Sequence, residues 1–126
     1  MKVLVVGAGP SGLSAAYHLA RLGHQIEIRD AGPMAGGMMH FGIPAYRMPR
    51  HILQRDIDII CSLGVEIVYD THVGKDISLM ELKEKFDAVL LAPGAHKSKP
   101  MGVEGEKEGY QGFLAGGIEF LRDAYM

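Results

Sequence analysis

Residues 3–12 read Val-Leu-Val-Val-Gly-Ala-Gly-Pro-Ser-Gly, and this stretch decides the fold. Its first four residues are a short apolar run, which is typical of a strand buried in a parallel sheet. Pro10 and Ser11 suit the first turn of a helix, because that turn leaves N–H groups unpaired and proline has none. Three glycines precede and follow them at G-x-G-x-x-G spacing: Gly7, Gly9 and Gly12. We therefore expect a strand, a tight turn and a helix in immediate succession.

This glycine spacing has a physical reason where a strand meets a helix. Gly7 permits the tight turn, Gly9 lets a pyrophosphate approach the backbone, and Gly12 lets the helix pack close to the strand. The helix then presents free N–H groups and its positive dipole end to the phosphates. Asp30 follows 18 residues after Gly12, at the end of the run Ile-Glu-Ile-Arg-Asp, where a carboxylate can accept ribose hydroxyls. The complete order of strand, loop, helix, strand and acid predicts a dinucleotide site, which the motif alone would not in a chain with 17 glycines.

The acid also bears on which dinucleotide binds. A carboxylate at Asp30 disfavours a 2′-phosphate, so FAD or NAD is expected before NADP. Arg29 beside it weakens that exclusion slightly.

Composition excludes several classes of function. The 126 residues amount to one domain or part of one, with a net charge of −2 and no basic stripe for nucleic acid. No apolar stretch is long enough to cross a membrane, so we expect a cytoplasmic protein. The single cysteine, Cys61, leaves no internal disulfide and no cysteine set for an iron–sulfur cluster, and core packing is its expected role. The six histidines show no metal-ligand spacing, so no metal site is expected.

Apolar periodicity predicts alternating strands and helices along the whole chain. The expected strands are 2–6, 25–29, 65–69 and 87–91, and the expected helices are 11–22, 50–63, 79–86 and 116–124. This order predicts an α/β fold with a doubly wound parallel sheet. Ligands on such sheets bind at the carboxyl ends of the strands, where residues 7–12, Asp30, 69–73 and 92–94 would meet.

Residues 31–49 form a loop that is too long to be a simple connection. Long ordered loops in compact domains are usually functional. The loop is rich in glycine and methionine, so it can lay its backbone against a flat ring and adapt its side chains around it. The alternative is a mobile surface loop, but its large apolar residues would be poor choices for solvent.

Two stretches resemble a known family. Residues 7–16 are similar to the FAD-binding opening of two-dinucleotide-domain flavoproteins, where the Pro-Ser pair favours FAD over NAD. Residues 36–49 resemble the G-G-x-x-x-Y-G-I-P-x-(F/Y)-R-(L/M)-P stretch of the glutamate synthase small (beta) subunit. Relatives of that subunit include the FAD domain of dihydropyrimidine dehydrogenase and the ferredoxin–NADP oxidoreductases of electron-bifurcating enzymes. The resemblance covers essentially all residues and implies a Rossmann-like FAD/NAD(P)-binding domain.

The resemblance implies FAD contacts in the glycine loop, residues 7–12, and at Asp30, after the second expected strand. Asp30 takes the place of the family's usual glutamate at the adenosine ribose. The residues that would hold the pyrophosphate are Gly7, Gly9, Pro10, Ser11 and Gly12.

Further contacts are implied along the rest of the chain. Gly37 and Met38 would lie near the pyrophosphate and flavin, and Arg47 would bind FAD through its fork of donors. Val73 would meet the adenine edge through its backbone. Ala92 and Gly94 would line the pyrophosphate side, and Pro93 between them departs from the threonine that relatives often carry. No side chain is expected to be catalytic.

Members of the family that the sequence resembles are longer than these 126 residues. They carry an N-terminal iron–sulfur domain and, beyond the position of Met126, an NADPH domain followed by a return segment that completes the FAD domain. We therefore expect residues 1–126 to be the first segment of an incomplete FAD-binding domain. If the return segment adds a strand beside residues 3–6, the chain alone leaves an open sheet edge, and we expect self-association or loose flavin binding.

The leading hypothesis is the FAD-binding part of an NAD(P)H-dependent flavin oxidoreductase. It would pass electrons from a nicotinamide through FAD to an iron–sulfur protein or another acceptor. NAD(P)H would bind to parts outside this chain, supplied by the remainder of the flavoprotein or by a partner subunit. The alternative is a non-catalytic FAD- or NAD-binding module, or a docking subunit completed by a partner chain.

Overall fold

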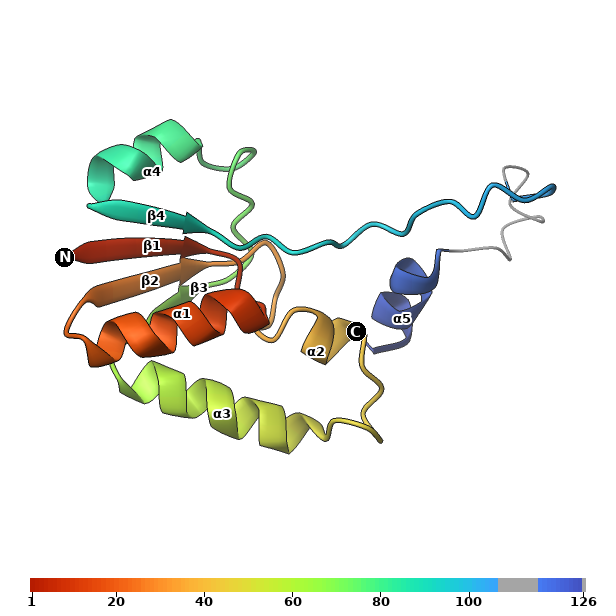
Figure 1. Cartoon of the computed structure of the whole chain (residues 1–126), viewed down its shortest axis with the longest axis horizontal. Coiled ribbons are helices and arrows are strands. Elements are labelled where there is room, and N and C mark those ends of the chain that lie inside the picture. Colours follow the sequence, from red (N-terminus) through yellow and green to blue (C-terminus); the bar gives the residue numbers. More distant parts are fainter. Residues whose placement is uncertain (107–115, 126) are drawn as a thin grey trace.

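In the computed structural model the chain forms a four-stranded sheet with helices on both faces (Figure 1). The structure describes residues 1–106 and 116–125. The sheet has the order β3-β2-β1-β4, and every neighbouring pair is parallel. Its strands are β1 (Lys2–Val6), β2 (Gln25–Arg29), β3 (Glu66–Val68) and β4 (Ala88–Leu91). The predicted α/β fold with a doubly wound parallel sheet is confirmed.

One face of the sheet is covered by α1 (Pro10–Arg21) and α3 (Arg50–Ser62) (Figure 1). The apolar side of α1 carries small residues, so the helix packs closely on β1 and β2. Eleven buried apolar residues form this core: Val3, Val5, Ala8, Leu13, Ala16, Ile26, Ile28, Ala35, Leu53, Ile57 and Val65. Cys61 is partly buried and packs against this cluster, as expected.

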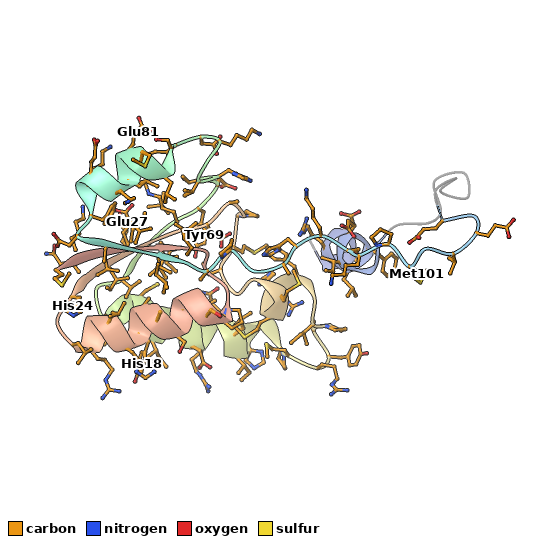
Figure 2. The ribbon with its side chains drawn as sticks, turned by 45° about the horizontal axis from the view of Figure 1, so that its top comes forward. His18, His24, Glu27, Tyr69, Glu81 and Met101 are labelled. Atoms are coloured by element: carbon orange, nitrogen blue, oxygen red, sulfur yellow. The ribbon has the colours of Figure 1, made fainter. Side chains whose placement is uncertain are left out.

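The opposite face is covered by α4 (Leu79–Lys85). Glu81 on α4 and His18 on α1 lie on opposite sides of the sheet (Figure 2). The helix begins with a capping box, in which the Ser78 side chain accepts the Glu81 N–H and the Glu81 carboxylate accepts the Ser78 N–H. The buried core on this face is smaller and consists of Leu4, Leu82 and Phe86.

The position of β1 corrects one expectation. Residues of β1 pair with β2 on one side and with β4 on the other, so no further strand can lie beside residues 3–6. The expected return strand therefore cannot pair there, because β4 already occupies the place. The open edges of the described sheet are β3 and β4.

Two helices lie at the carboxyl end of the sheet. The sequence predicted one uninterrupted loop over residues 31–49, but the structure contains a short helix there, α2 (Met38–Phe41). Four residues are too few for the apolar periodicity that identified the other helices. The last helix, α5 (Gly117–Tyr125), contacts α2. None of the helices in the described ranges has the length and apolar character needed to cross a bilayer.

Candidate dinucleotide-binding site

The glycine loop follows β1 directly, and two of its glycines are required by backbone packing. Gly7 has φ +109°, and a Cβ there would collide with the carbonyl of Ala92. A Cβ at Gly12 would collide with the carbonyl of Gly7. These two residues let β1, β4 and α1 approach one another closely.

Gly9 differs from Gly7 and Gly12 because a Cβ there would enter open space. Apart from chain neighbours, the nearest atom to that Cβ would be the Gly37 Cα, 4.0 Å away. An added methyl group would thus occupy the space above the first turn of α1 without meeting protein. This is the cradle that a bound diphosphate requires.

The first turn of α1 can bind an anion. Gly9 is the N-cap and supplies no side chain, and the turn contains no acidic residue. Within residues 1–106 and 116–125 the N–H groups of Ser11 and Gly12 donate to no backbone oxygen outside the helix, as geometry dictates for a first turn. Unpaired donors and the positive dipole end of a 12-residue helix fit the diphosphate of a dinucleotide.

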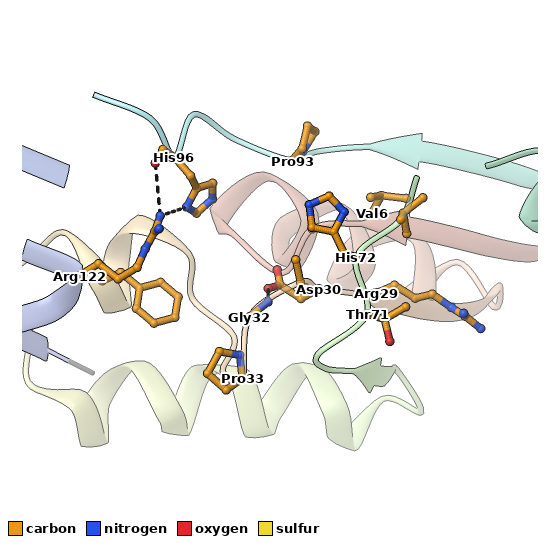
Figure 3. Close-up of a pocket in the computed structure, with 14 residues that line it drawn as sticks. Val6, Arg29, Asp30, Gly32, Pro33, Thr71, His72, Pro93, His96 and Arg122 are labelled. Carbon is orange, nitrogen blue, oxygen red and sulfur yellow. Dashed lines mark hydrogen bonds between the residues drawn. The ribbon is translucent and has the colours of Figure 1, made fainter. Parts of the chain in front are cut away.

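Asp30 ties the glycine loop to the end of β2. Its Oδ2 accepts the Ala8 N–H at 2.7 Å and its Oδ1 accepts the Gly32 N–H at 2.7 Å. Each carboxylate oxygen keeps a second lone pair, so these bonds leave room for ribose hydroxyls. Arg29, in contrast, points away from Asp30 (Figure 3), and its Nε donates to Glu27 at 2.7 Å.

The loop after β2 meets the glycine loop at a second glycine pair. The Gly36 N–H donates to the Ala8 carbonyl at 2.8 Å. Gly37 has φ +53°, and a Cβ there would stand 2.9 Å from the Gly9 Cα. Gly37 therefore lies beside the cradle, and only a glycine allows the two loops to approach this closely.

A cavity of about 490 Å³ opens at the carboxyl ends of β1 and β2 (Figure 3). Its lining includes three residues that the sequence predicted as cofactor contacts: Gly7, Asp30 and Val73. Phe41 of α2 and His72, beside Val73, add two aromatic rings to the lining. Arg122 of α5 also lines it, with its Nη2 3.3 Å from both the backbone oxygen and the Nδ1 of His96. The cavity thus combines a carboxylate, flat rings and a cation.

Other predicted contacts lie outside this cavity. Ala92 continues the sheet, with its N–H donating to the Val6 carbonyl at 2.8 Å, and its backbone adjoins Gly7. Gly94 turns the chain with φ +70°. Met38 begins α2 next to Gly37. Arg47 is exposed and is not among the described residues that line the cavity.

The neighbouring arginine was missed in the sequence. Arg50 donates to three carbonyls of the loop, those of Met39, Ile43 and Met48. Burial, and secondly the charge of Arg50, lower the pKa of His40 on α2. The signal available in the sequence was weak: Arg50 follows Pro49 at the first position of a helix, where a long side chain can reach back over the preceding loop.

Comparison with known proteins identifies the family. The profile of the pyridine nucleotide-disulphide oxidoreductases matches residues 1–121. The chain belongs to this family. The fold agrees, because the structure of FprA, an oxidoreductase of Mycobacterium tuberculosis, superposes with a TM-score of 0.81. That structure shares 20% sequence identity over 96% of this chain and 28% of its own.

Two relatives within this oxidoreductase family are similar in sequence. The chain is 68% identical to NADPH-Fe(3+) oxidoreductase subunit beta of Geobacter sulfurreducens, over 99% of this chain and 19% of that protein. It is 39% identical to the glutamate synthase [NADPH] small chain of Bacillus subtilis, over 82% of this chain and 21% of that protein. The resemblance to the glutamate synthase small subunit is therefore confirmed. The chain spans about a fifth of the length of these relatives.

Proposed function

We propose that this chain is the FAD-binding first segment of a larger NADPH-dependent flavin oxidoreductase. The observation that carries the proposal is the cradle formed by Gly9, Gly37 and the first turn of α1. The cradle suits a single dinucleotide. The names of both relatives refer to NADPH, which would need a second site. FAD, when bound, supplies the exchange between hydride transfer and single-electron transfer to an iron–sulfur protein or another acceptor.

The residues of this chain bind and orient the cofactor in this proposal. The N–H groups of Ser11 and Gly12 hold the diphosphate, while Asp30 accepts the adenosine ribose. Asp30 also repels a 2′-phosphate, and the ion pair with Glu27 partly neutralises Arg29, the neighbouring cation that could offset this repulsion. FAD therefore suits the cradle better than NADP, and the nicotinamide cofactor binds elsewhere in the protein.

The open edge at β4 supports a larger assembly. Leu90 and Leu91 are 39% and 57% exposed, although both belong to an apolar strand of a parallel sheet. Apolar edge strands in natural proteins are paired or covered. In this proposal the remainder of the polypeptide, or a partner subunit, covers β4 and completes the flavin pocket. Without that cover we expect self-association or loose flavin binding.

An absorbance spectrum and an electron-transfer assay test the proposal together. The full-length protein containing this sequence should show flavin bands in the visible region and release FAD on denaturation. It should also reduce a dye with NADPH, while residues 1–126 alone should not. A colourless protein that binds NAD and ignores FAD would refute the cofactor assignment. A flavin-loaded full-length protein without NAD(P)H oxidation would favour the non-catalytic binding module instead.

A further inference from the structure

Arg50 joins helix α3 to the loop that the sequence assigns to the flavin. Its Nη1 donates to the Met39 carbonyl at 3.0 Å and to the Met48 carbonyl at 3.4 Å. Its Nη2 donates to the Ile43 carbonyl at 2.9 Å. The three acceptors lie within α2, just after α2 and at the end of the loop. One side chain thus fixes three separate points along ten residues of irregular backbone.

The Met39 carbonyl belongs to a helix of only four residues, and the Ile43 and Met48 carbonyls belong to the loop after that helix. The last carbonyls of any helix lack intrahelical partners, and a guanidinium near them is favourable for its donors and its charge. The planar fork directs donors from two different nitrogens, which suits acceptors that lie apart. A lysine at this position would keep the charge and lose the fork.

The helix that carries Arg50 is itself firmly held. Leu53 and Ile57, one and two turns later, are 6% and 4% exposed and belong to the main core. The other end of the loop also rests on α3, because a Cβ at Gly36 would stand 2.9 Å from the Leu53 Cδ2. The loop is therefore attached to the rigid part of the molecule at both ends, and Arg50 is a principal attachment of its second half.

We propose that Arg50 is a positioning residue for the bound cofactor: it holds residues 38–48 in the shape that faces the flavin. This inference rests on the proposed function. Arg50 does not touch the cofactor in this account. Met38 and Arg47, which the resemblance places at FAD, are the residues whose position depends on it.

The test uses the full-length protein with Arg50→Lys and Arg50→Met. The matched control is Arg55→Met on the same helix, because the Arg55 side chain is 64% exposed and pairs only at the surface with Asp56, within the described residues. Removing one charged hydrogen bond is worth about ten-fold or more in an equilibrium constant. We expect both Arg50 variants to bind FAD at least about ten-fold more weakly and to fluoresce more strongly when bound, since a loose loop exposes the flavin. Arg55→Met should match the unmodified protein in both measurements.

A second measurement tests whether Arg50 holds the loop in place when no cofactor is bound. Trypsin cleavage after the exposed Arg47 in the FAD-free protein reports opening of the loop. We expect about a ten-fold faster cleavage in both Arg50 variants and no change in Arg55→Met. Wild-type cleavage rates in the Arg50 variants would overturn the inference even if FAD binding is lost. Faster cleavage with unchanged FAD affinity and fluorescence would overturn the cofactor role. A wild-type protein that binds no FAD would overturn the proposed function and this role together, while the cleavage rates would still decide whether Arg50 holds the loop.

Discussion

Strands β1 and β4 pair with each other and are similar in composition, yet their burial differs sharply. In β1, Val3, Leu4 and Val5 are at most 6% exposed, whereas Leu90 and Leu91 of β4 are 39% and 57% exposed. The difference comes from their neighbours. Strand β1 has a strand on each side and helices on both faces, while β4 has β1 on one side and α4 over one face.

The two strands differ in whether the described residues bury their apolar side chains. Most of those of β1 are buried, whereas much of the apolar surface of β4 is left for another part of the protein to cover. The unit of β1, α1 and β2 shares a buried core with Leu53 and Ile57 of α3, and it presents the glycine loop in a fixed shape. The β4 side has the same kind of apolar sequence, but among the described residues it has only α4 over one face and no strand at its outer edge. A strand whose composition demands burial, and whose surface is exposed, marks where a further part of the protein should pack.

The largest expected effect is at the glycine loop, which follows the buried strand β1. Gly12→Ala would place a methyl group against the Gly7 carbonyl, which belongs to the backbone and cannot rotate away. We expect the free energy of unfolding to fall by more than about 3 kcal/mol, measured by urea denaturation. Gly117→Ala is the control, because a Cβ there meets nothing within 4 Å. Equal stabilities for the two variants would show that the loop is less tightly packed than the structure indicates.

A pair of leucines tests the comparison directly. Leu4→Ala removes a fully buried side chain, and we expect a loss of about 3 kcal/mol in residues 1–126 alone. Leu90→Ala removes a side chain that is 39% exposed, and we expect a loss below about 1 kcal/mol in the same chain. In the full-length protein the cost of Leu90→Ala should rise toward that of Leu4→Ala. A cost that does not change would mean that nothing packs on this edge.

The same two strands show how far sequence reasoning reached. The run Val-Leu-Val-Val predicted a buried strand, residues 87–91 were predicted as a further strand, and the order of elements predicted the parallel sheet. Local patterns carry this information because strand pairing follows from chain order and apolar runs. The sequence did not reveal that β4 lies beside β1 or that it stays exposed, because both depend on contacts between distant segments.

The candidate site divides in the same way. The glycine loop could be predicted, because a strand that turns directly into a helix leaves no room for a Cβ at Gly7 and Gly12. Arg50 could not, because its acceptors are backbone carbonyls, which have no sequence signature. The sequence assigned Asp30 to the ribose alone, while its bonds to Ala8 and Gly32 give it a structural role as well.

Asp30 provides a smaller, two-part test. Asp30→Ala removes both carboxylate oxygens that accept backbone N–H groups, and we expect FAD affinity to fall by about ten-fold or more and stability by about 1–3 kcal/mol. Asp30→Asn keeps one carbonyl oxygen and can satisfy only one of the two N–H groups, so it should lie between Ala and the unmodified protein. FAD titration and thermal unfolding measure the two effects. Unchanged affinity with lower stability would assign Asp30 to the loop and not to the ribose.

The smallest expected effect is at the N-terminal cap of α4, on the face of the sheet that has the smaller buried core. Ser78→Ala removes the hydroxyl that accepts the Glu81 N–H, and we expect a loss of about 1 kcal/mol. Hydrogen bonds from the Ser78 side chain and N–H hold the pKa of Glu81 below its usual value of 4.5. A carboxylate with a lowered pKa in the folded state stabilises the protein above pH 4.5, and this stabilisation disappears as the pH falls through the folded-state pKa. The difference in melting temperature between Ser78→Ala and the unmodified chain should therefore be larger at neutral pH than at strongly acidic pH. Ser14→Ala, at an exposed position of α1, is the control and should show little difference at either pH. A Ser78→Ala effect independent of pH would mean that the hydrogen bond from the Ser78 hydroxyl to the Glu81 carboxylate does not stabilise the cap of α4.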